Sequence, residues 1–349
     1  MVDQFGNPPS RTPGRIIVPR GTAPKGPRVW TPKFRTLEVW DPIQRTARVE
    51  GFYRMHAVKR DGVTRARSSE WFHNLIVDTG MDQLATTFSP ISHCQVGTGN
   101  TAPAVGDTSL VAEIAETSTI QSGTQTENAS SPYDIRVSRT YRFGQGAAEG
   151  NLAEVGVGTA TILFSRELIR DGMGSPTTFP VASDEYLDVE YEIIVYPPLV
   201  DDTDTITVTN SGSHDTTMRA AGINSGGGAW QLKSGGIFEA TQADNYAVAY
   251  DGALGSVTGS PSGTSDAGAS SALSYTPGNF YRDAQHSYGL NEANFGTGIL
   301  SVQSRFGNSQ SVSVSQRSTL RFQCEYDPVI SKTSADTLTL TFRCAWARA

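Results

Sequence analysis

LTLTFRCAW, residues 338–346, alternates apolar and polar side chains with a period of two. Its apolar positions are Leu338, Leu340, Phe342, Cys344 and Trp346. Because successive side chains leave a β-strand on opposite faces, this pattern predicts a strand with one buried face. LRFQCEY at residues 320–326 alternates in the same way, and turn-forming residues separate the two runs. We therefore expect them to be neighbouring antiparallel strands.

Two more stretches repeat this alternation, residues 135–143 and 187–195, and Pro197 and Pro198 end the second one. Helical signals are few. Asp107 is a candidate N-cap for a short helix through Glu116, and residues 79–88 fit another turn or two. The sequence thus predicts an all-β protein made of two antiparallel β-sandwich-like domains with long Gly/Ser-rich loops.

The chain has 349 residues, about right for two domains of ordinary size. We expect an extended N-terminal arm over residues 1–35, a first β domain over 36–200 and a second over 201–349. Residues 210–236 and 251–279 are rich in Gly, Ser, Asn and Thr and predict long surface loops. The alternative is that such a loop presents a surface that binds a partner or the host.

The arm differs from the rest of the chain in composition and charge. Residues 1–35 hold seven of the 18 prolines, and their seven basic residues against one acid give +6. Since the whole chain carries −7, the remaining residues carry −13. So many prolines exclude a helix or a central strand. The arm is either a flexible tail or a segment that orders on a neighbouring subunit.

The candidate docking residues of the arm are Arg15, Ile17, Arg20, Arg28, Trp30 and Arg35. Nucleic acid is a weaker candidate partner, because the charges come without clustered aromatics or a recognisable nucleic-acid-binding fold. The sequence contains no apolar run long enough for a membrane span and no secretory signal at its N-terminus. Its cysteines, Cys94, Cys324 and Cys344, fit free, buried thiols in a reducing compartment.

No catalytic, cofactor or metal residues stand out. The Gly-rich turn at residues 97–100 has no following Gly-Lys-Ser/Thr, so it lacks the lysine that cradles phosphate. His93 and Cys94 would point to opposite faces of a strand. Asp201, Asp202 and Asp204 suggest either a calcium site or, with better support, a solvated linker between domains. We expect a protein that is not an enzyme, although distant paired carboxylates for glycan cleavage stay open.

Several stretches resemble a family of tailed-bacteriophage virion proteins of the tail, tail-fibre or collar type. The resemblance covers roughly residues 70–349 and rests on small motifs. These are Asn74–Ala85 (NLIVDTGMDQLA), Gln95–Leu110 (QVGTGNTAPAVGDTSL), Tyr141–Gly158, Leu163–Leu168 (LFSREL), Tyr186–Tyr196 (YLDVEYEIIVY), Tyr275–Asp283 (YTPGNFYRD), Asn291–Leu300 and Pro328–Arg348.

The resemblance implies a structural protein of the virion, assembled in the host cytoplasm as part of the tail, collar or fibre-attachment apparatus. Its expected partners are copies of itself, in a ring or trimer, and other virion proteins. The family offers no catalytic residues to carry over. A receptor-binding adhesin that serves host attachment is the alternative function, and a glycan depolymerase is the third.

Overall fold

The computed structural model describes residues 34–39, 41–87, 89–128, 130–221, 246–307 and 319–349. Within these residues the protein is all-β, as the sequence predicts, with one short helix, α1 (Asp78–Thr86). The helix overlaps the stretch, residues 79–88, where the sequence allows a turn or two, and begins one residue earlier. Residues 34–349 form one compact unit.

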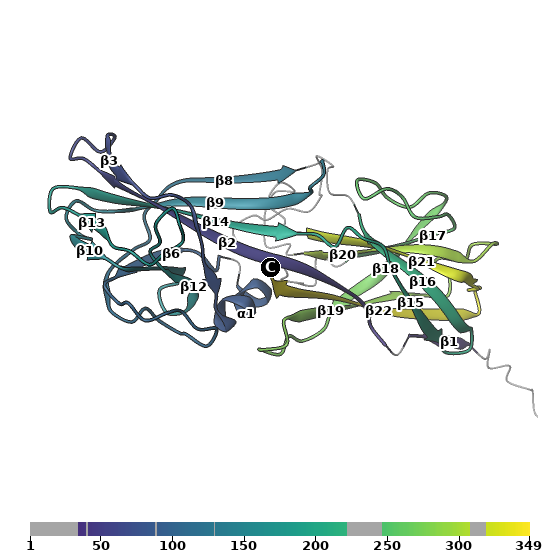
Figure 1. Cartoon of the computed structure of the whole chain (residues 1–349). Coiled ribbons are helices and arrows are strands. Elements are labelled where there is room, and N and C mark those ends of the chain that lie inside the picture. Colours follow the sequence, from purple (N-terminus) through teal and green to yellow (C-terminus); the bar gives the residue numbers. More distant parts are fainter. Residues whose placement is uncertain (1–33, 40, 88, 129, 222–245, 308–318) are drawn as a thin grey trace, which may run out of the picture. The chain divides into compact units, whose positions relative to one another are not determined.

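The strands of the main sheet are β1 (Arg35–Glu38), β2 (Ile43–Val58), β3 (Arg65–Ser68), β4 (Phe72–His73), β8 (Ile120–Asn128), β9 (Asp134–Phe143), β14 (Tyr186–Tyr196), β15 (Asp202–Val208), β16 (Gly212–Ala220), β17 (Tyr246–Tyr250), β18 (Ser265–Ala272), β19 (Tyr281–Tyr288), β20 (Ile299–Gly307), β21 (Thr319–Ile330) and β22 (Asp336–Arg348). Their order is β15-β16-β21-β20-β17-β18-β19-β22-β2-β14-β9-β8 (Figure 1). Three short strands join the sides of this path: β1 pairs with β22, and β3 and β4 pair with β2.

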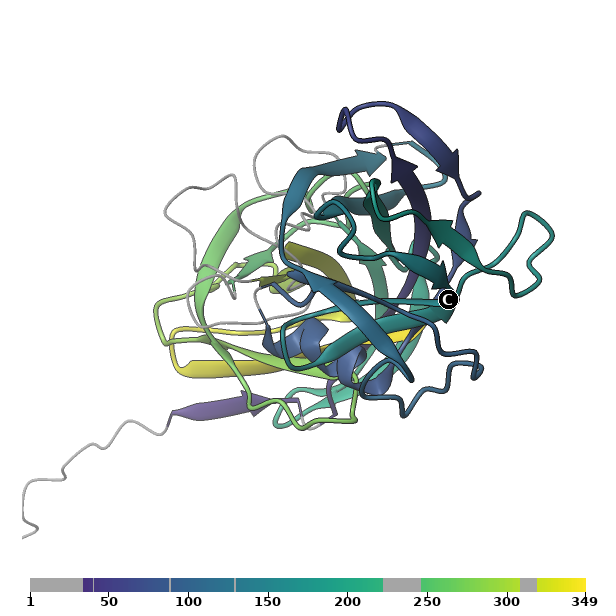
Figure 2. The same cartoon turned by 90° about the vertical axis from the view of Figure 1, so that its left-hand side faces the viewer.

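The sheet from β15 to β22 curls back on itself (Figure 2). An antiparallel bridge between Val39, just after β1, and Val208, at the end of β15, brings its two edges together. Two pairings are parallel, β1 with β22 and β2 with β22. Alternation of side chains tells which face is buried but not the direction of the neighbouring strand, so the sequence predicted only antiparallel pairs.

A second, five-stranded sheet contains β5 (Leu75–Ile76), β12 (Leu163–Leu168), β11 (Glu154–Gly158), β6 (His93–Gly97) and β7 (Glu113–Thr117), in that order. A small pair joins β10 (Gly150–Leu152) to β13 (Phe179–Val181). The five-stranded sheet packs on β2 and β14: Tyr53 hydrogen-bonds Ser165, and the rings of Phe164 and Tyr191 lie 6.4 Å apart. These contacts give the first half a sandwich-like arrangement of two layers.

The predicted inward faces are correct. Leu187, Val189 and Tyr191 of β14 are fully buried, and so are Leu338, Leu340 and Phe342 of β22. The predicted pairing of the last two strands is wrong. β21 pairs with β16 and β20, whereas β22 pairs with β19, β1 and β2. Both strands bury an apolar face in the curled sheet, so the alternation is satisfied without direct contact between them.

The predicted helix from Asp107 to Glu116 is also absent; Glu113–Thr117 is strand β7. The Asp107 carboxylate accepts the Ala104 N–H at 2.8 Å and pairs with Arg166 at 2.7 Å. The backbone N–H groups of Val111 and Ala112 donate to the buried carboxylate of Glu154. The Asp107 carboxylate and the N–H groups of Val111 and Ala112 therefore have tertiary partners in place of the cap and backbone hydrogen bonds of a helix.

Parts of the predicted loops are strands, since β16 lies within residues 210–236 and β18 within 251–279. Residues 222–245 lie outside the described residues. The predicted boundary near residue 200 falls between β14 and β15, and β1 and β2 pair with β22 across it. The division of residues 34–349 into two domains stays a prediction.

Candidate functional site

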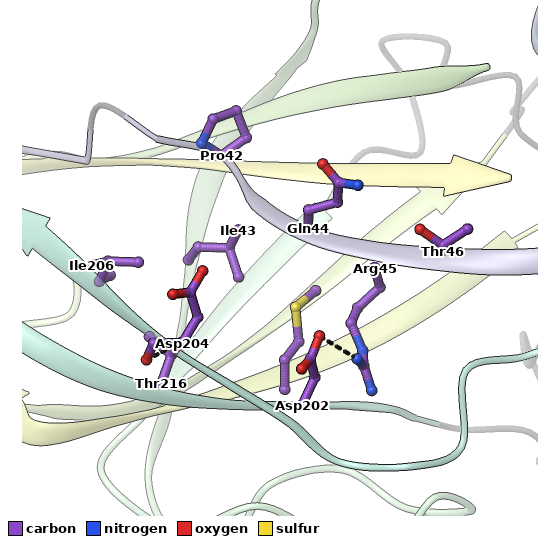
Figure 3. Close-up of a pocket in the computed structure, with 10 residues that line it drawn as sticks. Pro42, Ile43, Gln44, Arg45, Thr46, Asp202, Asp204, Ile206 and Thr216 are labelled. Carbon is purple, nitrogen blue, oxygen red and sulfur yellow. Dashed lines mark hydrogen bonds and ion pairs between the residues drawn. The ribbon is translucent and has the colours of Figure 1, made fainter. Parts of the chain in front are cut away.

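A groove of about 430 Å³ lies between the start of β2 and the edge strand β15 (Figure 3). It is lined by residues 42–46, by Asp202, Asp204 and Ile206 of β15, and by Thr216 and Met218 of β16. Three of these side chains are apolar and buried, namely Ile43, Ile206 and Met218. The groove therefore combines an apolar floor with acidic side chains.

Arg45 is the charged residue that the fold buries at this groove. Only 8% of its surface is exposed. Its guanidinium pairs with Asp202 across the groove at 2.7 Å, and the two side chains point toward each other in Figure 3. Another nitrogen, Nη2, donates to the carbonyl oxygen of Val200. The third nitrogen, Nε, is buried without a hydrogen-bond partner, a condition that costs roughly 1–3 kcal/mol.

Asp204 connects the groove to the outer face of β15 and β16, since it lines cavities on both sides. Among the described residues no ion pair involves its carboxylate, which accepts the backbone N–H of Thr205. The outer cavity, about 470 Å³, also contains Asp215, Glu325 and Asp327. We call Asp204, Asp215, Glu325 and Asp327 the acidic face.

Within the acidic face, Asp215 of β16 is the direct cross-strand neighbour of Asp327 of β21. Like charges in this position destabilise a sheet. The nearest basic residue on β16, Arg219, is already engaged, because it forms a bidentate pair with Asp201 and donates to the carbonyl of Gly255. The acidic face is therefore uncompensated by cations within the described residues.

The interpretation of Asp201, Asp202 and Asp204 as a solvated linker is confirmed in their exposure, but Asp202 and Asp204 belong to strand β15 and not to a linker. The calcium alternative gains no support. Asp201 and Asp202 are each paired with an arginine, and the described residues contain no group of three or more His, Cys, Asp or Glu side chains arranged to hold a metal.

Of the six predicted docking residues, Arg15, Ile17, Arg20, Arg28 and Trp30 lie outside the described residues. Arg35 lies in β1, where it forms a bidentate pair with the buried Asp336 at 2.8 and 3.1 Å. This pairing holds the pKa of Asp336 well below its ordinary value. Arg35 also donates to the carbonyl of Asn210 at 3.1 Å. It thus anchors the end of the arm beside the β15–β16 turn.

The Gly-rich loop at residues 97–100 is filled by the protein's own carboxylate. The N–H of Gly99 donates to Glu154 at 3.1 Å, and Arg166 pairs with the same carboxylate at 3.2 Å. Both charged side chains are almost completely buried. The backbone donor that could have met an external phosphate therefore has an internal partner.

One cluster has the residue types of a hydrolase triad. The Ser68 hydroxyl lies 2.7 Å from His56 Nδ1, and His56 Nε2 lies 3.0 Å from Glu190. Arg54 and Arg65 bind the same Glu190 carboxylate. Burial alone would raise the pKa of Glu190, but Arg54 and His56 hold it below its ordinary value. Neither the groove nor the outer cavity includes Ser68. We interpret the cluster as a network of ion pairs between neighbouring strands.

A second serine–histidine arrangement lies inside the curled sheet. His286 contacts the hydroxyls of Ser270 at 2.6 Å and Ser304 at 2.8 Å. Burial lowers the pKa of His286 to about 3, so the ring is neutral at ordinary pH. His286 and Ser304 are fully buried and out of reach of a substrate. The three residues satisfy one another's hydrogen bonds in the core.

The cysteines are buried as predicted, and none of the three is in a disulfide. Burial raises the pKa of the Cys324 thiol to about 12 and raises that of Cys94 and Cys344 well above the ordinary value. They are poor nucleophiles, because the thiolate is the reactive form. Cys324 lies on β21 and Cys344 on β22, and these two strands do not pair with each other.

No family model, no curated protein and no solved structure matches this chain. In the part of the chain that the structure describes, no helix is long and apolar enough to cross a membrane. The sequence indicates the acidic residues 201–204 but not the residues that lie beside them in the fold. The start of β2 and the strand β21 come from distant parts of the chain, and only the sheet order brings them beside β15.

Proposed function

We propose that this chain is a non-enzymatic structural subunit of a tailed-phage particle, in the tail, collar or fibre-attachment apparatus. It would assemble in the host cytoplasm with copies of itself and with other virion proteins. The motifs that resemble virion proteins motivate the particle. The all-β body, with its long paired strands and few helical residues, supports a rigid building block.

The observation that supports assembly with other subunits is the opposite net charge of the arm and of the rest of the chain. The first 35 residues carry +6, and the remainder carries −13. The last residue of the arm, Arg35, begins strand β1, which is a parallel partner of β22. A basic segment attached firmly to an acidic body favours association between subunits by charge complementarity.

Mass spectrometry of purified particles from the phage that encodes the chain tests this proposal. We expect peptides from this chain at a fixed stoichiometry relative to the other virion proteins, and we expect them to stay with the particle through a density gradient. Recovery of the chain only from the infected-cell lysate, with none in the particles, would reject the proposal.

A receptor-binding adhesin is the second candidate. Trp71 and Met173 are large, exposed side chains, and they lie on neighbouring loops, because Gly172 approaches the side chain of Glu70. Exposed aromatic and apolar side chains on loops favour contact with a partner. Binding of the purified chain to host cells, abolished by Trp71→Ala, would favour this candidate over an internal position in the particle.

A further inference from the structure

We propose that the groove between β2 and β15 binds the basic stretch Arg15–Arg20 from the N-terminal arm of a second copy of this chain. The inference deepens the proposed function, since it names the contact through which copies assemble, and it rests on that proposal only in taking the copies to associate. The acidic face would take up the basic residues that flank this stretch.

The edge of β15 is open along the groove. β15 pairs with β16 on one side, and on the other side its described contact to the main chain is the single bridge from Val208 to Val39. No described strand pairs with residues 202–207 on that side. An edge strand of this kind presents unpaired backbone groups to an extended peptide.

The side chains of the groove suit an occupant that is both apolar and basic. Ile43, Ile206 and Met218 form a buried apolar floor. Asp204 contributes a carboxylate without an ion-pair partner among the described residues.

The arm contains a stretch with this chemistry. Residues 15–20 read RIIVPR, three apolar residues between two arginines. Its single proline, Pro19, is compatible with an added edge strand, where one N–H faces away from the sheet. The net charge of residues 1–33 is +5, from six basic residues and one acid, and it complements the acidic face.

The direction of β1 favours a second copy over the chain's own groove. Val39 pairs with Val208 in antiparallel fashion, the Thr209 N–H donates to Glu38, and Arg35 reaches Asn210. Chain preceding Arg35 therefore starts beyond the β15–β16 turn. Asp202 lies at the opposite end of β15, roughly 20 Å away at about 3.3 Å per residue. The 14 residues between Arg20 and Arg35 are long enough to span that distance. To reach the chain's own groove they would have to reverse direction, whereas a second copy requires no such reversal.

Site-specific photocrosslinking of the full chain tests the inference. Ile17→p-benzoyl-phenylalanine protein is prepared in ordinary and nitrogen-15-labelled forms, mixed in equal amounts and irradiated. We expect cross-links from position 17 to peptides containing residues 42–46 or 202–206, in pairs that join one ordinary and one labelled peptide. The matched control, Met173→p-benzoyl-phenylalanine at a position that is 93% exposed, should give no such pairs.

A charge reversal at Asp204 is the second test in this experiment. Asp204→Lys in the cross-linking protein should lower the yield of groove cross-links about tenfold, since it places a cation against the arginines. Asp184→Lys, the same charge change at an exposed residue away from the groove, should leave the yield unchanged. Asp204→Asn, which leaves the shape of the side chain nearly intact, replaces Asp204→Lys if the lysine variant does not fold.

Cross-links to other surfaces, or an equal loss of yield in Asp184→Lys, would overturn the groove as the site. Cross-links confined to peptides of one isotope would place the arm on its own body and overturn the second copy. These failures are distinct from failure of the proposed function. If the chain cross-links as described but is missing from purified particles, the inference is supported and the virion role is rejected.

Discussion

Asp215 on β16 and Asp327 on β21 face each other directly across an antiparallel strand pair on the outer side of the sheet. Asp215 accepts the Thr205 hydroxyl at 2.7 Å, and no ion pair involves Asp327 among the described residues. Two carboxylates in this position repel each other. The isolated subunit thus tolerates a repulsion that a basic partner would relieve.

Asp327→Asn should therefore stabilise the isolated protein while weakening self-association. Removing one of the two charges should raise the free energy of unfolding by about 0.2–1 kcal/mol, and the gain should shrink at high salt. Urea unfolding at low and at high ionic strength measures the effect. A lower stability at low salt, with Asp184→Asn as the matched control, would show that Asp327 makes a favourable contact instead.

Leu340→Asp and Thr341→Lys test the register of β22. Leu340 is fully buried, so an aspartate there would lose its hydration without gaining a partner, at a cost of several kcal/mol. Thr341 lies on the opposite, partly exposed face, where a lysine reaches solvent. Thermal melts of both purified variants check this. A parent-like melt for Leu340→Asp beside an unfolded Thr341→Lys would mean that the two faces are exchanged.

The alternation of apolar and polar residues in β14 gives a wrong expectation for Glu190. The sequence predicts that the polar face of residues 187–195 tolerates a charge reversal such as Glu190→Lys. In the structure Glu190 accepts hydrogen bonds from Arg54 and Arg65 and contacts His56. A lysine would meet cations alone, so we expect destabilisation. Periodicity identifies which residues point away from the core, but it cannot identify the strands that cover them.

Other differences between sequence and structure have the same cause. The buried faces of β9, β14, β21 and β22 are local properties, and the sequence predicts them. The partners of β21 and β22 depend on the order of strands that are distant in the chain. The groove combines the start of β2 with β15, residues about 160 positions apart, so no local pattern could reveal it.

His286 should make stability depend on pH in a defined window. Its pKa falls from the ordinary 6.5 to about 3 in the folded protein, so between these values the unfolded state binds the additional proton. Stability therefore decreases as the pH falls below about 6.5, by on the order of 1 kcal/mol per pH unit from this residue.

His286→Gln retains an amide that can hydrogen-bond Ser270 and Ser304 but does not titrate. Chemical unfolding between pH 7 and 5 should show a shallower loss of stability than in the parent. His73→Gln, at a half-exposed histidine, is the matched control. If the parent and His286→Gln lose stability in parallel, His286 is accessible to protons in the folded state.

Ser68 should behave as an ordinary surface hydroxyl despite its contact with His56. The partner carboxylate of His56 is already bound by Arg54 and Arg65, and burial lowers the pKa of His56 below its ordinary value. We expect no labelling of Ser68 by a fluorophosphonate probe that modifies activated serines. Stoichiometric labelling that disappears in Ser68→Ala would reopen the question of a hydrolase.

The occupancy of the chain in purified particles, compared between the full chain and a variant lacking residues 1–33, tests the central claim most directly. Residues 34–349 form their own compact unit, so the deletion should leave the melting temperature close to that of the parent. We predict that the truncated chain is depleted from particles at least about tenfold, the loss of roughly 1.4 kcal/mol of association free energy. Normal occupancy of a folded, truncated chain would contradict the account.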